Sequence, residues 1–210
     1  MALTKIIGQG IGTLGSGAEA DAKIVFDGNA QDFYIGLDDS SDILAIGNGT
    51  DLGASRAIIV DANGIIRTSQ QPAFSASPSA NLENFAINQY NNVNFDSERF
   101  DRNADYNAGG SPSTFVAPVT GIYQLNFHLY ILSVDTAATW FQFSILTSNK
   151  EYTSILDPNF SGDLGYYPMN LSVAADMDAN DSAYVRVYQL GGSAQMDVAG
   201  NSSFSGYLIG

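Results

Sequence analysis

The sequence lacks cysteine, is poor in basic residues and has a single histidine, His128. Without cysteine, it can form neither a disulfide framework nor a thiolate metal site. Its 8 lysine and arginine residues stand against 22 acidic ones, and the formal net charge of −14 leaves no basic patch to neutralise a phosphate backbone. We therefore expect no nucleic-acid partner. One histidine without an obvious nucleophile beside it indicates that the protein is not an enzyme.

The sequence also lacks long hydrophobic runs. No stretch approaches the ~20 apolar residues of a membrane-spanning helix. The first eight residues, MALTKIIG, lack the apolar core of a signal peptide. These absences predict a soluble protein that does not insert into a membrane and carries no N-terminal export signal.

Aromatic and turn-forming residues are abundant instead, with 12 Phe, 11 Tyr and 21 Gly. In the segment 121–132, apolar and polar residues alternate with the period of a β-strand. One face of this predicted strand carries Tyr123, Leu125, Phe127, Leu129 and Ile131, and the other carries Gln124, Asn126, His128 and Tyr130. Segments 139–146 and 183–190 alternate in the same way, and no helical period is present. The fold class predicted is all-β, as a sandwich or jelly roll.

Changes in composition divide the sequence into regions. These are a Gly-rich N-terminal arm at 1–21, a short-stranded β region at 22–70 and a long-stranded region at 71–210. The Gly-rich segment 8–17 is not expected to bind a nucleotide, because no strand precedes it and no helix follows. The Ser/Pro/Ala-rich segment 68–82 forms the boundary before the last region.

The region 22–70 reads as short strands separated by turns. The pairs Asp27-Gly28 and Asn63-Gly64 predict tight turns between strands. The strands themselves are too short and too few to enclose a core of their own, so we expect them to gain burial by association with other copies.

Region 72–210 carries several short motifs in a fixed order. Phe115, Pro118, Gly121 and Tyr123 form the pattern Phe-x-x-Pro-x-x-Gly-x-Tyr. Further matching segments are Pro72–Ala76, Asn92–Asp96, Asn180–Val185 and the closing Ser203–Ile209. Together the motifs resemble the globular head of the first complement component, in the superfamily shared with tumour necrosis factor. The resemblance implies a ten-stranded jelly roll that forms a tight homotrimer around a threefold axis.

The resemblance also places the strand at 121–132 on the sheet that faces the neighbouring subunits. Its polar face cannot lie in a dry hydrocarbon core. Either solvent or a hydrogen-bonded subunit interface would accommodate that face, and tyrosine is enriched at interfaces. The candidate trimer-interface residues are Gln124, Asn126, His128, Tyr130, Tyr184 and Tyr188.

The chain departs from the animal members of that superfamily, since no collagen-like Gly-x-y stalk and no secretion signal precede the head. Residues 22–67 resemble the strand-and-turn segments of bacteriophage fibre proteins instead. We therefore expect a virion structural protein, a trimeric phage fibre or spike, that contacts other virion proteins through residues 1–70. Its head would bind a host-surface glycan or protein, or decorate the capsid. The alternatives are a free bacterial lectin-like or signalling ligand with a trimeric head, and a polysaccharide depolymerase.

Recognition would fall to loops, because a jelly-roll scaffold holds variable loops rigidly. Segments 101–113 and 157–167 are rich in Gly, Asn, Asp and aromatic residues, which suit stacking on sugars and hydrogen bonding to hydroxyls. Merely permissive loops would have the same composition. The candidate receptor-loop residues are Asp101, Asn103, Tyr106, Asn107, Asn159, Phe160, Asp163 and Tyr166.

Two acidic groupings raise the question of metal binding or glycan cleavage. The run Asp176-x-Asp178-x-Asn180 begins like a calcium loop. However, Asp181 stands where the turn glycine belongs, and Val187 where the bidentate glutamate belongs. The densest carboxylate cluster, which a glycan-cleaving enzyme would need, is Asp96, Glu98, Asp101 and Asp105. Solvated loops account for both groupings, so we expect no cofactor, with calcium in a head loop as the alternative.

Overall fold

The chain divides into two compact units, Met1–Gln71 and Pro72–Gly210. The computed structural model describes residues 14–15, 17 and 19–210, so most of the Gly-rich arm predicted at 1–21 lies outside the described residues. The described part of the chain has strands, turns and one 3-10 helix, but no α-helix. It holds no helix long and apolar enough to span a membrane. The all-β prediction is confirmed.

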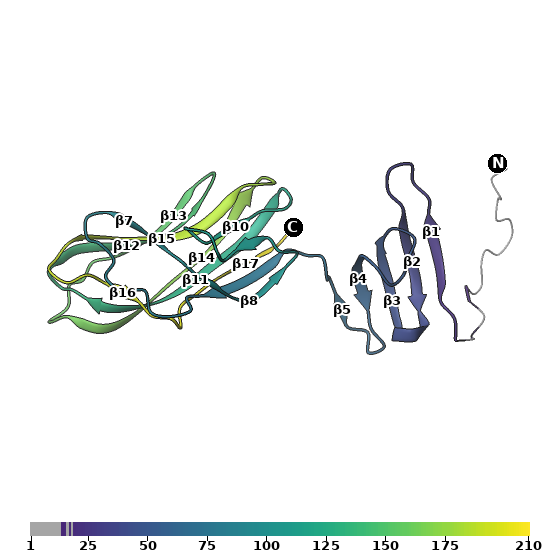
Figure 1. Ribbon diagram of the computed structural model, residues 1–210, viewed down its shortest axis with the longest axis horizontal. Coiled ribbons are helices and arrows are strands. Elements are labelled where there is room, and N and C mark those ends of the chain that lie inside the picture. The colour runs from purple at the N-terminus through teal and green to yellow at the C-terminus, as the bar shows by residue number, and fades with distance from the viewer. Residues whose placement is uncertain (1–13, 16, 18) are drawn as a thin grey trace. The chain divides into compact units, whose positions relative to one another are not determined.

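The N-terminal unit contains one antiparallel sheet, with its five strands in sequence order (Figure 1). The strands are β1 (Ala22–Phe26), β2 (Phe33–Asp38), β3 (Ile43–Asn48), β4 (Arg56–Val60) and β5 (Ile66–Arg67), and the 3-10 helix η1 (Asp39–Ser41) joins β2 to β3. The tight turn predicted at Asp27-Gly28 is instead the start of a longer connection, in which the Gly28 N–H donates to Asp32 Oδ1 at 3.0 Å. The Asn63-Gly64 pair does lie between β4 and β5, and Gly64 has φ +79°.

One face of this sheet has a small core, so the expectation that these strands enclose no core is wrong. Tyr34 and Ala45 are fully buried there and Leu52 is 2% exposed. Leu52 belongs to the segment between β3 and β4, which folds over this face and supplies the covering layer that the strands lack. The Tyr34 hydroxyl donates to the Ala54 carbonyl oxygen at 2.7 Å. Position 47 must be glycine, because a Cβ atom there would lie 2.5 Å from Tyr34 Oη.

The C-terminal unit, hereafter the head, is a sandwich of two six-stranded antiparallel sheets. The first sheet runs β14-β11-β17-β6-β8, with β16 also paired to β11, and the second runs β13-β12-β15-β10-β9, with β7 also paired to β15. The strands are β6 (Ala73–Ser77), β7 (Tyr90–Val93), β8 (Ser97–Arg102), β9 (Tyr106–Asn107), β10 (Thr114–Val116), β11 (Gly121–Val134), β12 (Ala138–Thr147), β13 (Glu151–Leu156), β14 (Leu164–Met177), β15 (Ser182–Gly191), β16 (Asp197–Val198) and β17 (Ser203–Leu208). The sandwich is jelly-roll-like, as predicted. It has twelve strands rather than ten, and two of them, β9 and β16, are only two residues long.

The core of the head lies between these sheets and is rich in aromatic rings. The apolar face of β11 points into it, and residues 123, 125, 129 and 131 are fully buried, as their alternation predicts. The Phe74 ring stacks between Tyr106 and Phe115, with centroid distances of 4.8 and 4.7 Å. Position 206 in the closing strand is glycine because a Cβ atom there would lie 2.8 Å from Phe74 Cε1. Large buried rings of this kind carry much of the hydrophobic stabilisation of a domain.

A buried carboxylate braces one end of the head. Asp135, 2% exposed, follows β11. Its Oδ2 accepts hydrogen bonds from the N–H groups of Ser193 and Ala194, and its Oδ1 accepts one from the Ala137 N–H at 2.7 Å. The backbone N–H of Ala194, together with those of Ser193 and Ala137, holds the pKa of the Asp135 carboxyl below its ordinary value.

Candidate assembly and recognition surfaces

The outer face of the β14-β11-β17 sheet is polar and uncharged at its centre. We call it the polar sheet face, made of Gln124, Asn126, His128, Tyr130, Asn170, Ser172, Ser203 and Ser205. Successive residues of a strand point to opposite faces, so the buried residues of β11 turn these neighbours outward. A hollow of about 360 Å³ lies over the middle of this face, lined by side chains from all three strands.

Hydrogen bonds between strands fix the side chains of the polar sheet face. His128 Nδ1 and Asn170 Oδ1 are 2.7 Å apart across the β11–β14 pair. The Ser172 hydroxyl donates to Asn126 Oδ1 at 2.7 Å, and Gln124 Nε2 donates to the Ser172 hydroxyl oxygen at 2.9 Å. Side chains held in this way lose little further rotamer freedom on binding, which favours a protein interface.

Aromatic rings border the polar sheet face. Tyr166 stacks on Tyr130 at a centroid distance of 5.5 Å and is 66% exposed. Tyr207, paired with Gln124, is 50% exposed, and Phe100 on β8 is 51% exposed. Exposed tyrosine and phenylalanine rings are enriched at protein–protein interfaces relative to the rest of a protein surface.

The six candidate interface residues do not share one surface. Gln124, Asn126, His128 and Tyr130 lie together on the polar sheet face, whereas Tyr184 and Tyr188 lie on β15 in the other sheet. The two sheets pack through their inner faces, so outward side chains of β11 and β15 point in opposite directions. Tyr184 and Tyr188 therefore do not belong to the polar sheet face, and they could join a threefold interface only as part of a second patch.

The outer face of the second sheet has its own aromatic group. Tyr188 stacks on Trp140 at 5.1 Å and packs against Tyr90 at 5.0 Å. The Arg186 guanidinium lies 3.9 Å from the centroid of the Tyr90 ring and is paired with Glu151 at 2.8 Å. Unlike the centre of the polar sheet face, this group includes a charged pair, Arg186 and Glu151.

The two candidate receptor loops lie at opposite ends of the head. Segment 103–113 follows β8. Cross-strand pairing through β6 and β17 places the last residue of β8, Arg102, at the same height in the sheet as Gln124, near the start of β11. Segment 157–163 precedes β14, whose first residue pairs with Val134 at the end of β11. Ten residues of strand separate these levels, a distance of about 33 Å. One copy of the head therefore cannot use both loops against one small ligand.

The first candidate loop is largely committed to the fold. Tyr106 is 5% exposed, its ring stacks on Phe74, and its hydroxyl donates to the Phe95 carbonyl oxygen at 3.2 Å. Burial raises the pKa of the Tyr106 hydroxyl to about 12. Asp101 accepts the N–H groups of residues 105 and 106 through its two carboxylate oxygens, at 3.2 and 3.0 Å. Assigning Tyr106 to a receptor loop is wrong, and of the candidate residues in this loop only Asn103 and Asn107 have exposed side chains.

The second candidate loop keeps more of its surface. Asn159 is exposed and Phe160 is 36% exposed, resting against Tyr167 at a centroid distance of 5.8 Å. Asp163 has a structural role, since one of its oxygens accepts the Thr136 N–H at 2.8 Å and the Thr136 hydroxyl at 2.6 Å. Tyr166 is not in the loop at all but within β14, beside the polar sheet face.

The carboxylate cluster at 96–105 does not form an acid–base pair. The Asp96 carboxylate accepts both the N–H and the hydroxyl of Ser79 at 2.7 Å, and these bonds hold its pKa below the ordinary value. Asp105 behaves in the opposite way, because burial and the nearby charge of Asp101 raise its pKa. Glu98 is exposed on β8. Asp96 and Asp101 are thus held by local hydrogen bonds, whereas Asp105 Oδ2 is buried without a hydrogen-bond partner in the described structure.

The segment that begins like a calcium loop forms an ordinary turn. Asp181 Oδ2 accepts the Asp178 N–H at 2.9 Å and the Asn149 side-chain amide at 2.8 Å. Asn180 takes the left-handed conformation, with φ +74°. Within residues 14–15, 17 and 19–210, no three or more His, Cys, Asp or Glu side chains are arranged to hold a metal ion.

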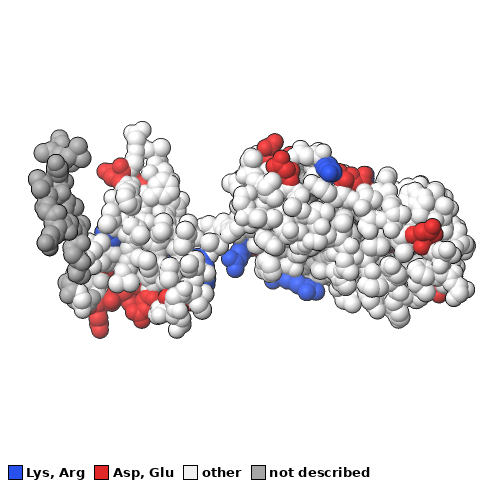
Figure 2. All heavy atoms as spheres, turned by 180° about the vertical axis from the view of Figure 1, so that it is seen from behind, with Lys and Arg blue, Asp and Glu red and all other residues white. Residues whose placement is uncertain are grey.

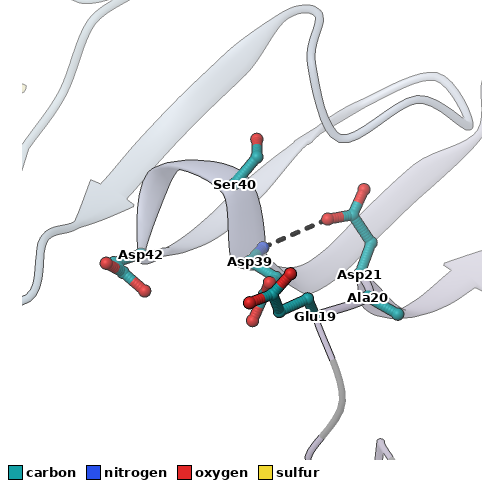
Figure 3. A pocket seen from close by; sticks show the side chains of 6 residues that line it. All are labelled: Glu19, Ala20, Asp21, Asp39, Ser40 and Asp42. Carbon is teal, nitrogen blue, oxygen red and sulfur yellow. Dashed lines mark hydrogen bonds between the residues drawn. The ribbon is translucent and has the colours of Figure 1, made fainter.

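An acidic hollow of about 720 Å³, which the sequence analysis did not single out, lies in the N-terminal unit beside η1 (Figure 3). Glu19, Asp21, Asp39 and Asp42 line it, and the Asp39 N–H donates to Asp21 Oδ1 at 3.1 Å. In Figure 3 the carboxylates do not converge on one point. In the sequence, only the acidic run Asp38-Asp39-Ser40-Ser41-Asp42 indicates this hollow. Solvated turns contain acidic runs of the same kind, so the run does not distinguish the two.

The family model of the C1q domain matches residues 73–209, almost the whole head. The chain belongs to the C1q domain family. Domains of the C1q and tumour necrosis factor superfamily are trimeric recognition or signalling modules rather than enzymes. A search of curated proteins finds no match to the chain.

Solved structures with a similar fold cover about two thirds of the chain. The globular domain of zebrafish complement 1qA is 15% identical, with a TM-score of 0.49, over 67% of this chain and 98% of that one. Murine APRIL is 9% identical, with a TM-score of 0.47, over 66% of this chain and 99% of that one. The Eiger TNF of S. frugiperda is 9% identical, with a TM-score of 0.45, over 67% of this chain and 94% of that one.

Proposed function

We propose that the protein is a homotrimeric recognition protein, assembled through the polar sheet face of the head. The observation that carries this proposal is the exposure of Tyr166 and Tyr207 beside a hydrogen-bonded, uncharged sheet face. A monomer would leave these rings in water, whereas a subunit interface would bury them and keep their hydroxyl groups hydrogen-bonded. Membership of a family whose domains form homotrimers supports the same arrangement.

The setting that we propose is a virion, where the chain would form a phage fibre or spike. Residues 1–70 would bind other virion proteins, and the head would bind a host-surface glycan or protein or decorate the capsid. Support for this setting comes from the likeness of residues 22–67 to fibre segments, together with a head that needs no disulfide bond. Immunogold labelling of purified virions with an antibody against the head would test it. Labelled particles are expected, and unlabelled particles with the protein free in the lysate would contradict the virion role.

For recognition we propose the end of the head that carries segment 157–163. Asn159 and Phe160 are exposed there, on a segment that is anchored by the bonds of Asp163 to Thr136. Trimers of a Phe160→Ala variant should bind host cells at least tenfold less than wild type. Asn107→Ala, at the other end of the head, is the matched control and should bind normally. Equal binding by all three proteins would rule out this end as the recognition surface.

Trimer formation is tested by the mass in solution. Light scattering at micromolar concentration should give three times the 22.3 kDa of one chain. An obligate interface should bury more than about 2,000 Å² in total. His128→Asp places a charge at the centre of the polar sheet face and should reduce the mass to that of one chain. A wild-type mass of 22.3 kDa would overturn the proposal.

A further inference from the structure

The second face of the N-terminal sheet is apolar and uncovered in a single copy. Cross-strand register aligns Ile24, Ile35, Ile46 and Ile58 in one row across four strands. A second row contains Ala22, Leu37, Leu44, Val60 and Ile66, and a third contains Phe26, Phe33 and Asn48. We call these twelve positions the apolar sheet face. Asn48 is its only polar residue, and none of the twelve is charged.

The two faces of this sheet differ in what covers them. The segment with Leu52 packs over Tyr34 and Ala45 on one face. On the apolar sheet face, by contrast, eight large side chains are 38–68% exposed, among them Phe26 at 59% and Ile66 at 68%. Figure 2 shows acidic side chains toward both ends of this unit, with uncharged atoms over most of the visible surface between them.

The exposed area is at the upper end of what a solitary soluble unit leaves uncovered. The eight side chains present on the order of 700 Å² of apolar surface, if a large side chain exposes roughly 150–250 Å² when fully free. The largest apolar patch on a typical monomer is about 300–600 Å². A stable interface buries about 800 Å² on each partner, so this one face nearly suffices for an interface.

A second and a third copy of the same face are the partners that the chain itself supplies. Only four residues, 68–71, separate β5 from the head, and a fully extended link of that length spans at most about 14 Å. In a trimer of heads, three N-terminal sheets would be tethered together at an effective concentration of about millimolar. Apolar sheets pack face to face at about 10 Å, and a face without charge offers nothing to attract a charged partner.

We propose that the apolar sheet face packs against the same face of the two other copies, so that the N-terminal sheets form a second trimeric core. This inference rests on the proposed trimer of heads. It assigns the N-terminal unit a role in assembly that is separate from any attachment to other proteins. Because the interface is made of uncharged, mostly apolar rows, it should be insensitive to salt and sensitive to an added buried charge.

Single-cysteine variants of the full chain test this inference, since the natural sequence has no cysteine to interfere. Ile46→Cys places a thiol in the middle of the apolar sheet face. Ile65→Cys is the matched control, because Ile65 is 57% exposed in the turn before β5 and is not part of that face. Both variants are examined for mass in solution, for reaction with a maleimide reagent, and for linkage by a bismaleimide that spans about 10 Å, the spacing of packed sheets.

We expect both variants to have the trimer mass. The thiol of Ile46→Cys should react at least ~10-fold more slowly than that of Ile65→Cys, which corresponds to about 1.4 kcal/mol of protection. The bismaleimide should link chains of Ile46→Cys and not those of Ile65→Cys. Trimers in which both thiols react equally fast would overturn the inference and leave the trimer of heads intact.

Other outcomes identify other occupants of the face. Trimers in which the Ile46→Cys thiol is shielded but not linked would show that another segment, such as residues 1–13, covers the face, and would also overturn the inference. A monomer mass for the wild-type chain would remove the trimer of heads and this inference together.

Discussion

The head and the N-terminal unit are both antiparallel β-structures, but they bury their apolar residues differently. The head closes two sheets over a core that includes Phe74, Phe115 and Phe204, each at most 1% exposed. The N-terminal unit has one sheet, whose core consists of Tyr34, Ala45 and Leu52. A unit of two packed sheets buries its apolar residues within one copy. A single sheet leaves one apolar face exposed unless another layer packs on it. The comparison predicts that the head is intrinsically stable and that the N-terminal unit depends on assembly.

Truncating a side chain in the core of the head should lower the free energy of unfolding most. Phe74→Ala removes a ring stacked between Tyr106 and Phe115 and should cost about 3–5 kcal/mol of unfolding free energy. Denaturant unfolding followed by aromatic fluorescence would measure this. Ile155→Ala, at a position that is 55% exposed on β13, is the control and should change stability by less than about 0.5 kcal/mol. If the two variants lost the same free energy of unfolding, Phe74 would not be a core residue as described.

Removal of the buried Asp135 carboxylate should cause the next largest loss of stability. Asp135→Asn loses charge-assisted hydrogen bonds from the Ala194 and Ala137 N–H groups, at about 1.5–3 kcal/mol for a bond to a charged group. Because these bonds lower the pKa of Asp135 in the folded state, its stabilising contribution is present above the ordinary pKa of about 3.9 and is lost as pH falls through the folded value.

This contribution has a pH signature. Thermal unfolding between pH 7 and pH 2 should show a steeper loss of stability in the wild type than in Asp135→Asn, so that the two curves converge in acid. Parallel curves would show that the Asp135 carboxylate does not brace the end of the head.

A substitution in the small core of the N-terminal unit should lower stability less. Tyr34→Phe removes the hydroxyl that donates to the Ala54 carbonyl oxygen and should cost about 1 kcal/mol. The effect should be confined to hydrogen exchange of amides in residues 22–67, with no change in the head. Increased exchange in both units would contradict their independence.

A surface ion pair should matter least. Arg186 and Glu151 pair at 2.8 Å, and both side chains are only partly buried. Glu151→Gln should lower stability by less than about 1 kcal/mol, since exposed pairs are weak and are screened by salt. A loss above about 2 kcal/mol in the same unfolding measurement would show that the second sheet relies on this pair more than the geometry indicates.

The features that could be predicted from the sequence are local ones. Alternation with period two correctly assigned both faces of β11, because successive strand residues point to opposite sides whatever the partner strand is. The ordered motifs from Phe115 to Ile209 indicated the C1q-like head. Gly206 in the closing motif has a structural reason, because the core leaves no room for a side chain there.

The sequence was least informative where long-range pairing decides the outcome. Tyr184 and Tyr188 alternate as clearly as Tyr130, but only the pairing of β15 with β12 shows that they lie on the other sheet. Tyr106 sits in a Gly- and Asn-rich segment typical of a loop, yet the bonds of Asp101 turn it onto Phe74. The apolar sheet face depends likewise on a register across several strands, which no single segment contains.

The measurement that tests the trimer most directly compares two tyrosines on opposite sheets. Tyr130→Asp and Tyr188→Asp each place a charge on an outward face of the head, and circular dichroism would verify that both variants fold. By native mass spectrometry, we predict one chain of 22.3 kDa for Tyr130→Asp and three chains for both Tyr188→Asp and the wild type. A trimeric Tyr130→Asp beside a monomeric Tyr188→Asp would contradict the account, because it would place the subunit interface on the opposite sheet.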